Sequence, residues 1–294
     1  MSRGPVRLYP AGYRAVHGPE IAETHRELTA GLPRAARLRA DADLAAHALR
    51  MRLGLDPAAP GGRLFALAAP FALATAAVVA GLELTDWYRT LVISPTTLRT
   101  MVAGTGAGWG LYLLCSLLVC VGAILALTGR WVAGVAAVTG GLLGTVALWP
   151  AVGPARGGGA LVPVLALLTV AVVLACPPDR RADPEACTAA GVMAAVAWFP
   201  LVAVGTGGFA VSTDYGAWPL LVLAASGLVL AVRRRSRGLY ELGAMAVASP
   251  PLIGRAYADA WLDPWPVAGL LLVLPLGAAL SVGVWRVRRV RRGS

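Results

Sequence analysis

Residues 64–82, LFALAAPFALATAAVVAGL, decide the class of fold to which this sequence belongs. This stretch has no charged side chain, and its length approaches the ~20 residues that an α-helix needs to cross a bilayer. Similar stretches recur toward the C-terminus, so that 57% of the 294 residues are hydrophobic and only 14% are charged. Because a soluble domain carries about a quarter charged residues, the composition predicts an all-α, polytopic transmembrane helical bundle.

Eight apolar segments have about the length of a membrane span. They cover residues 64–82, 109–127, 131–150, 160–176, 187–204, 218–232, 239–253 and 265–284. The seventh is short and contains Glu241 and the pair Pro250-Pro251, so it is either a broken span or a re-entrant segment. Residues 1–62 contain no long apolar run. We expect them to form a small cytoplasmic helical domain and linker, without a cleavable signal peptide, ahead of a membrane domain of residues 63–294.

The distribution of arginine predicts the orientation in the membrane. All 26 basic residues are Arg, and an N-in, C-in topology places 22 of them on the cytoplasmic side and 4, among them Arg255, outside. This imbalance follows the positive-inside rule and predicts a multi-pass protein of the cell membrane with both termini in the cytoplasm. The basic runs 233–237 and 286–292 directly follow spans. Their expected partner is therefore anionic inner-leaflet lipid and not nucleic acid.

The absence of lysine excludes several enzyme classes. P-loop NTPases, protein kinases and pyridoxal-phosphate enzymes all depend on a Lys, and this chain has none. No cofactor is predicted. Cys176 and Cys187 flank the short segment 177–186 between two predicted spans. They are interpreted as small apolar residues at helix ends. The alternative interpretation is a redox pair or half of a metal site. No paired-carboxylate, His–Cys or metal signature is present in the sequence, so an enzymatic activity is not favoured.

Carboxylates gather at the predicted outer ends of the spans. The candidate outer-face polar cluster consists of Glu83, Asp86, Asp214, Asp259 and Asp263. Such a cluster is able to bind a cation or to serve acid–base chemistry, and a solvated rim is the alternative interpretation. Within the spans, ionisable residues are almost absent, which disfavours a proton-coupled pump. Hydroxyl side chains at depth are expected to bond back to their own helices.

Small residues and turn residues give further local predictions. Ala136, Gly140 and Gly144 form a small-xxx-small row that is expected to pack inside the bundle, with a dimer face as the alternative. The glycine-rich segment 104–108 is interpreted as a flexible lead into the second span. In the N-terminal segment, a helix from about Pro10 is expected to stop near Gly18. Two further helices are then expected, one from Pro19 and one over about 33–53, the latter along the membrane surface.

One N-terminal motif resembles a known family. It comprises Leu8-Tyr9-Pro10, Tyr13-Arg14, His17-Gly18 and Glu20-Ile21. The motif resembles the helical prefix domain ahead of bacterial ABC permeases of the macrolide-exporter type, and the start of a group of actinobacterial multi-span membrane proteins of unassigned function. The resemblance covers about the first 50 residues and brings no catalytic residues. It implies an association with transport, with Tyr9, Tyr13, Arg14, His17 and Glu20 as a candidate partner-binding motif.

Three functional hypotheses follow. The first is a permease-like or transport-associated subunit, which needs a separate ATPase because the chain has no nucleotide site of its own. The second is a membrane-anchored interaction protein that binds a regulatory protein through its N-terminal helices. The third and weakest is an intramembrane enzyme acting on lipid or isoprenoid substrates. A homo-oligomer is compatible with the first two.

Overall fold

The described part of the chain is helical throughout. The structure is a computed structural model, and it describes residues 5–56, 59–93, 98–152, 161–177, 183–205, 217–234 and 238–259. Within these ranges every regular element is a helix and no strand is present. The chain divides into two compact units, Met1–Arg63 and Leu64–Ser294.

The first unit contains a short 3-10 helix, η1 (Pro5–Leu8), and the two α-helices α1 (Ala11–Thr29) and α2 (Arg34–Arg52). The expected helix end at Gly18 is wrong, because α1 continues through Pro19. Gly18 does not take the left-handed conformation that would end the helix. The effect of Pro19 on α1 is the loss of one helical hydrogen bond, because proline has no N–H. The helix predicted over 33–53 is confirmed by α2.

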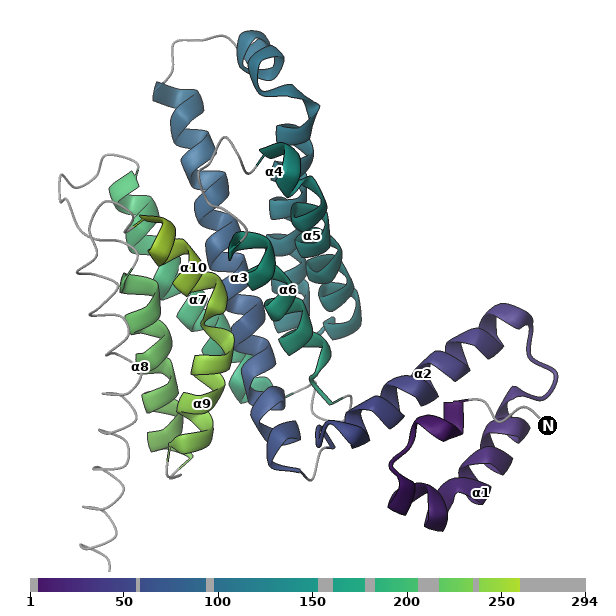
Figure 1. Cartoon of the computed structure of the whole chain (residues 1–294). Helices are drawn as coiled ribbons and strands as arrows, with labels where there is room; N and C mark the ends of the chain where they lie inside the picture. Colours follow the sequence, from purple (N-terminus) through teal and green to yellow (C-terminus); the bar gives the residue numbers. More distant parts are fainter. Residues whose placement is uncertain are drawn as a thin grey trace, which may run out of the picture. The chain divides into compact units, whose positions relative to one another are not determined.

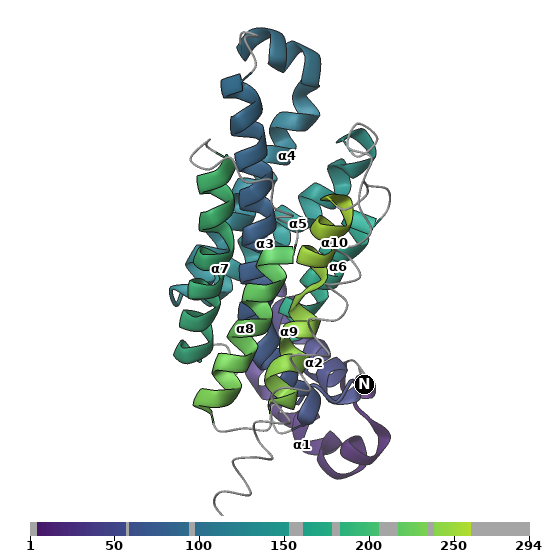
Figure 2. The same ribbon diagram turned by 90° about the vertical axis from the view of Figure 1, so that its left-hand side faces the viewer.

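The described residues of the second unit form a bundle of eight helices arranged around α3. The helices are α3 (Pro60–Ile93), α4 (Leu98–Leu127), α5 (Trp131–Val152), α6 (Leu161–Leu174), α7 (Pro184–Gly205), α8 (Ala217–Arg233), α9 (Leu239–Ala248) and α10 (Pro250–Asp259). Figures 1 and 2 show α3 between α5 and α6 on one side and α7 to α9 on the other. The glycine-rich segment 104–108 is not a lead into the second span but part of the helix α4.

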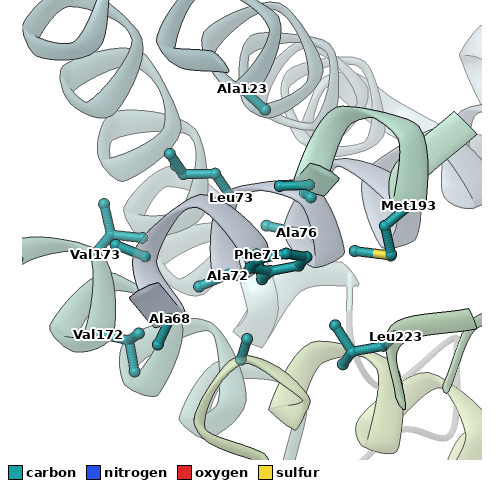
Figure 3. Packing of buried hydrophobic residues seen from close by; sticks show 14 of the residues in the cluster. Ala68, Phe71, Ala72, Leu73, Ala76, Ala123, Val172, Val173, Met193 and Leu223 are labelled. Atoms are coloured by element: carbon teal, nitrogen blue, oxygen red, sulfur yellow. The ribbon is translucent and has the colours of Figure 1, made fainter. Parts of the chain in front are cut away.

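The core of this unit is built on the small side chains of α3. Ala68, Ala72 and Ala76 are almost completely buried, and so are the larger Phe71 and Leu73 between them. Figure 3 shows the side chains that surround them, and these come from α4 (Ala123), α6 (Val172 and Val173), α7 (Met193) and α8 (Leu223). Alanine lets neighbouring backbones approach closely, so one helix is able to contact several others at once.

Three described helices are long and apolar enough to cross a membrane. They are Pro60–Tyr88, Gly108–Leu127 and Trp131–Val152. Four more of the predicted spans correspond to shorter apolar helices, Leu161–Leu174, Pro184–Phe199, Trp218–Arg233 and Leu239–Ala248. The predicted span 265–284 lies outside the described residues.

Helices α4 and α5 form a tight hairpin. The turn between them uses Gly129, which has φ +100, and the Arg130 N–H donates to the Leu125 carbonyl at 2.8 Å. A Cβ on Gly141 would lie 2.7 Å from the Cys115 carbonyl oxygen, and a Cβ on Gly122 would lie 2.8 Å from the Ala137 Cβ. The two helices are therefore as close as glycine permits.

The predicted small-residue row does not form this contact as a whole. Gly144 does face α4, where a Cβ would meet the Cys115 sulfur. Ala136 is exposed, and a Cβ added to Gly140 would meet no atom of the described chain within 4 Å. The expectation that all three residues pack inside the described bundle is thus wrong for two of them. The face of α5 that contacts α4 is a neighbouring one, on which Gly134 and Gly141 provide the close approach.

The break expected in the seventh span is present, between α9 and α10. Pro250 and Pro251 begin α10 and have no N–H to donate to the preceding turn. The Ser249 hydroxyl instead donates to the Ala246 carbonyl at 2.8 Å. The Thr75 hydroxyl of α3 lies 2.9 Å from the Ala248 carbonyl and 3.0 Å from the Ala72 carbonyl of its own helix, and these two acceptors share its one proton. Away from water, such a break is stable only when neighbouring groups satisfy the freed carbonyls.

The glycine contact between α4 and α5 gives a matched test. We expect Gly141→Ala to lower the stability of the full chain by about 1–3 kcal/mol, since the new Cβ must push two backbones apart. We expect Gly140→Ala, one position away, to be neutral or to raise stability by up to about 1 kcal/mol through helix propensity. Thermal unfolding of the purified protein in detergent measures both. Equal effects of the two substitutions would contradict the described register of the hairpin.

The bond from Thr75 to the helix break gives a second prediction. Thr75→Val keeps the shape of the side chain but leaves the Ala248 carbonyl without this donor, so we expect a loss of about 1–3 kcal/mol in unfolding free energy. Thr85→Val is the control, because the Thr85 hydroxyl donates to a carbonyl of α3, that of Gly81 at 2.8 Å, whereas Thr75 also reaches the carbonyl at the break. A Thr75 variant as stable as the Thr85 variant would show that the break does not need this donor.

Candidate functional site

The second unit contains a partly enclosed cavity of about 310 Å³. Helices α3, α4, α5, α6 and α10 supply its walls. Its apolar lining comes mainly from alanine, valine and leucine side chains such as Ala76, Val119, Leu142 and Leu165. Its polar lining consists of Glu83, Asp86, Tyr112, Ser116, Thr145, Trp149, Thr169 and Arg255. A cavity with apolar walls and a few polar groups is the usual form of a small-molecule site.

An ion group that joins two helices forms part of the cavity lining. Arg255 of α10 lies with its Nη2 atom 2.8 Å from Asp86 Oδ2 and its Nη1 atom 3.5 Å from Glu83 Oε1. Glu83 and Asp86 are three residues apart on α3, so they share one face of the helix. The Glu83 side chain is 14% exposed, that of Arg255 24% and that of Asp86 44%. Of the two carboxylates, that of Glu83 is therefore nearly buried and that of Asp86 is in contact with solvent.

The break between α9 and α10 places Arg255 in this group. The new helix α10 begins at Pro250, one residue after α9 ends, and its residues Pro251, Gly254 and Arg255 all line the cavity. Gly254 permits the approach to α6, since a Cβ there would clash with the Leu165 side chain. Helix α10 thus supplies both a part of the cavity wall and the guanidinium of the ion group.

Three hydroxyl groups in the wall donate their protons to their own helices. Ser116 donates to the Tyr112 carbonyl at 3.1 Å, Thr145 to the Leu142 carbonyl at 2.7 Å, and Thr169 to the Leu165 carbonyl at 2.8 Å. These bonds confirm the expected back-bonding for Ser116, Thr145 and Thr169. The expectation is wrong for Thr139, whose hydroxyl oxygen is buried and has no hydrogen-bond partner in the described chain. A hydroxyl that donates in this way keeps its oxygen as an acceptor, so these side chains offer acceptors to the cavity.

An aromatic group lies beside the ion group on α3 and α4. The rings of Trp87 and Trp109 are stacked with centroids 5.7 Å apart, and Tyr112 meets Trp109 edge-on at 6.0 Å. Offset and edge-on ring pairs stabilise beyond their buried area. Tyr112 is itself part of the cavity wall, so this aromatic group fixes one side of the site.

The structure brings together two of the five residues of the predicted outer-face polar cluster. Of its five members, Glu83 and Asp86 come together in the cavity lining. Asp214 and Asp263 lie outside the described residues, and so does the side chain of Asp259, the last residue of α10. The residue that sequence reasoning missed is Arg255, which the sequence identifies only as one of the four outer arginines. The signal available for it is the Pro250-Pro251 pair, which indicates that a new helix starts just before it.

The N-terminal motif belongs largely to the internal packing of the first unit. Tyr9 is buried at 2% exposure, its hydroxyl shares a 2.7 Å hydrogen bond with His47 Nδ1 of α2, and its ring stacks on Tyr13 at 5.5 Å. Burial, followed by the proximity of Tyr13, raises the pKa of Tyr9, and Arg50 partly opposes this shift. Tyr9 therefore holds η1 against α2 as a neutral phenol.

The other members of the N-terminal motif lie closer to the surface. Arg14 donates to the Arg7 carbonyl at 3.1 Å, and the Tyr13 and His17 rings lie 4.8 Å apart. His17 Nδ1 lies 3.8 Å from Glu20 Oε2, and both side chains are well exposed. Within the motif, these exposed residues are the ones accessible to a partner.

Metal-ligating side chains are not grouped in the described ranges. There, no three His, Cys, Asp or Glu residues are placed to hold a metal ion. The four cysteines, Cys115, Cys120, Cys176 and Cys187, all lie within the described ranges, and none of them forms a disulfide. The cavity with its ion group is therefore the site that the side chains of the described chain define best.

Comparison with known proteins adds no family to this description. A scan against models of protein families, a search of curated proteins and a search of solved structures each found no match.

The ion group gives a third prediction. Arg255→Met leaves Glu83 and Asp86 facing each other without the guanidinium, so we expect a loss of about 2 kcal/mol in unfolding free energy. We expect most of this loss to be recovered when Glu83→Gln and Asp86→Asn are added to Arg255→Met. Thermal unfolding in detergent measures the cycle, with Arg233→Met at the exposed end of α8 as the control. An Arg255 variant no less stable than the Arg233 variant would contradict the structural role of this group.

Proposed function

We propose that this protein is a permease-like or transport-associated membrane subunit that holds a small molecule in the cavity between α3, α4, α5, α6 and α10. The observation that supports this proposal is the cavity itself, whose volume of about 310 Å³ lies at the lower end of the range of small-molecule sites, about 300–1,000 Å³. Its walls belong to five different helices, so small shifts between them would change access to it.

The proposed topology has eight spans with both termini in the cytoplasm. It is supported by the excess of arginine on one side of the predicted spans and by three described helices of sufficient length and apolarity. The four shorter apolar helices and residues 265–284 would provide the remaining spans. In this topology the first unit is cytoplasmic, the cavity opens near the outer surface, and the arginine runs contact anionic inner-leaflet lipid.

The energy source for transport would be a separate ATPase. A chain without lysine has no P-loop, and the described spans hold few ionisable groups that would carry protons. The N-terminal unit, which resembles a permease prefix domain over its first 50 residues, is the proposed contact for this partner.

A membrane-anchored interaction protein is the second candidate. It is favoured by the surface of the first unit, where Val16, Leu28, Leu38, Leu49 and Leu53 are each more than half exposed. Apolar side chains at this density on a separate helical unit suit a partner protein or the membrane surface. In this case the cavity would have no ligand and would serve only as a packing feature.

A substitution that fills the cavity distinguishes the two candidates. Ala166 of α6 lines the cavity, whereas Ala171 on the same helix is exposed. The full-length protein and its Ala166→Phe and Ala171→Phe variants would be purified in mild detergent, and small molecules extracted from each would be identified by mass spectrometry. We expect one compound to accompany the wild type and Ala171→Phe, and to be at least about tenfold depleted from Ala166→Phe, because phenylalanine occupies the space.

The same preparations report on the partner. Co-purification of an ATPase, with nucleotide-dependent uptake of the compound into proteoliposomes, is the result that the first candidate predicts. Recovery of a regulatory protein alone, lost when residues 1–55 are deleted, together with equal small-molecule content in all three preparations, would overturn the transport proposal in favour of the second candidate.

A further inference from the structure

We infer that helix α2 of the first unit docks on the surface of an anionic membrane, with an exposed apolar stripe in the lipid and flanking arginines at the lipid phosphates. The inference goes beyond the proposed function, which leaves open whether a protein or the membrane covers the exposed leucines of this unit. It does not use the cavity, and it requires only that the second unit spans a bilayer.

An unbroken apolar stripe runs along the outer side of α2. Its members follow one another at intervals of three or four residues, the spacing that keeps side chains on one face of a helix. All of them are exposed, and the three leucines are each more than half exposed. The stripe consists of Ala35, Leu38, Ala42, Ala46, Leu49 and Leu53. At a rise of 1.5 Å per residue it is about 27 Å long.

The opposite side of α2 belongs to the core of the first unit. Ala48 is completely buried there, and Leu44 and Met51 are partly buried. On the same side, Asp41 Oδ1 lies 2.8 Å from Nε2 of His25 in α1. The helix therefore has two apolar faces, and packing within the described unit covers only one of them. The stripe is the face that is left uncovered.

Arginine is the nearest charged residue at both edges of the stripe. In a helix with 3.6 residues per turn, Arg34 and Arg52 lie along one edge, and Arg39 and Arg50 lie along the other. The apolar stem of an arginine side chain covers apolar surface while its guanidinium reaches outward. A guanidinium is also a good donor to phosphate oxygens. An apolar face bordered by arginines is typical of a helix that lies in the membrane interface.

The charge of the first unit is unevenly divided between its two long helices. With histidine neutral, α2 contains five arginines and two aspartates, a net charge of +3. Helix α1 contains two arginines and three glutamates, a net charge of −1. A negative surface therefore attracts α2 and not α1. The exposed Val16 and Leu28 of α1 lie outside the stripe and remain available to a partner protein.

A second copy of α2 fits the stripe poorly. Two such stripes placed face to face would bring arginine edges together, and like charges across an interface are unfavourable. A different protein partner would need acidic residues along both edges of its own apolar surface. The inner leaflet of a membrane offers negative charge around any apolar insertion. The charges therefore favour the membrane as the occupant.

The chain itself keeps α2 close to the membrane. Helix α2 ends at Arg52, and α3, the first described helix that is long and apolar enough to cross a membrane, begins at Pro60. The chain between these two residues spans at most about 29 Å. A free peptide with three exposed leucines would bind a membrane weakly, but a short tether gives an effective concentration on the order of millimolar. Weak apolar and charge contacts are then sufficient for docking.

The test measures the lipid contact of α2 in the full-length protein by electron paramagnetic resonance. The four native cysteines, none of which forms a disulfide, would be replaced by alanine. A nitroxide label would then be attached either at Ala42→Cys in the stripe or at Ala22→Cys, an exposed alanine of α1. Each protein would be placed in nanodiscs of phosphatidylcholine alone or mixed with phosphatidylglycerol. Oxygen, which enters the acyl chains, and a water-soluble nickel chelate then report the surroundings of the label.

The two labels should respond differently to the lipid. In nanodiscs with phosphatidylglycerol, we expect the ratio of oxygen to nickel accessibility to be at least about fivefold higher at position 42 than at position 22. In phosphatidylcholine alone we expect the two positions to differ by less than about twofold, because the attraction between arginine and anionic lipid is removed.

Arginine substitutions test the charged part of the contact. Each arginine near an anionic surface strengthens binding about fivefold. We therefore expect Arg34→Gln combined with Arg39→Gln, one from each edge of the stripe, to lower the ratio of docked to free α2 about thirtyfold. Arg14→Gln combined with Arg26→Gln is the matched control, because it removes the same charge from α1, and it should change the ratio less than about twofold.

Leucine substitutions test the apolar part. We expect Leu38→Gln combined with Leu49→Gln to make the label at position 42 as accessible to the nickel chelate as the label at position 22, since charge alone does not insert the helix. Both leucines are more than half exposed, so the fold of the unit should be kept. An unchanged line shape of the label at position 22 verifies this in each variant.

Three results would overturn the inference. The first is a label at position 42 that is as accessible to the nickel chelate as the label at position 22 in anionic nanodiscs. The second is equal protection of position 42 in neutral and anionic nanodiscs. The third is spin–spin broadening at position 42, which would show that a second copy of the chain covers the stripe. The proposed function is tested separately by Ala166→Phe, so its failure and the failure of this inference are distinguishable.

Discussion

The rest of the second unit depends on the close approach of several helices to α3. A helix in the centre of a bundle contacts several neighbours only if its side chains are small on more than one face. The alanines of α3 meet this condition, and the larger Phe71 and Leu73 fill the space between them. At Gly81 the Trp198 side chain of α7 packs directly on the backbone of α3, because a Cβ there would lie 2.9 Å from the indole nitrogen. The hairpin of α4 and α5 uses the same device through glycine.

The same central helix also stabilises an interruption in its neighbour. Where α9 ends and α10 begins, two prolines remove backbone donors, and Thr75 of α3 donates to the carbonyl of Ala248. Helix α10, which follows this break, brings Arg255 beside Glu83 and Asp86.

The polar groups of the cavity are engaged with one another or with the backbone. Its hydroxyls are back-bonded, its carboxylates are paired with a guanidinium, and the described chain has no group of metal ligands. The separate unit Met1–Arg63 has exposed apolar residues, and these would provide the contact surface in either of the two proposed functions.

The sequence by itself determined the helical class, the approximate bounds of several helices of the second unit, and the break at Pro250-Pro251. These features follow from apolar length and from the missing proline N–H, which are local properties. Only the tertiary structure decided which small residues of α5 face α4, since Gly140 and Gly141 are chemically identical and differ only in direction. It likewise decided that Tyr9 is a packing residue and that Arg255 meets Glu83 and Asp86. Tyr9 and His47 are 38 positions apart, and Glu83 and Arg255 are 172 positions apart. Such pairs come together through tertiary packing, which local sequence does not encode.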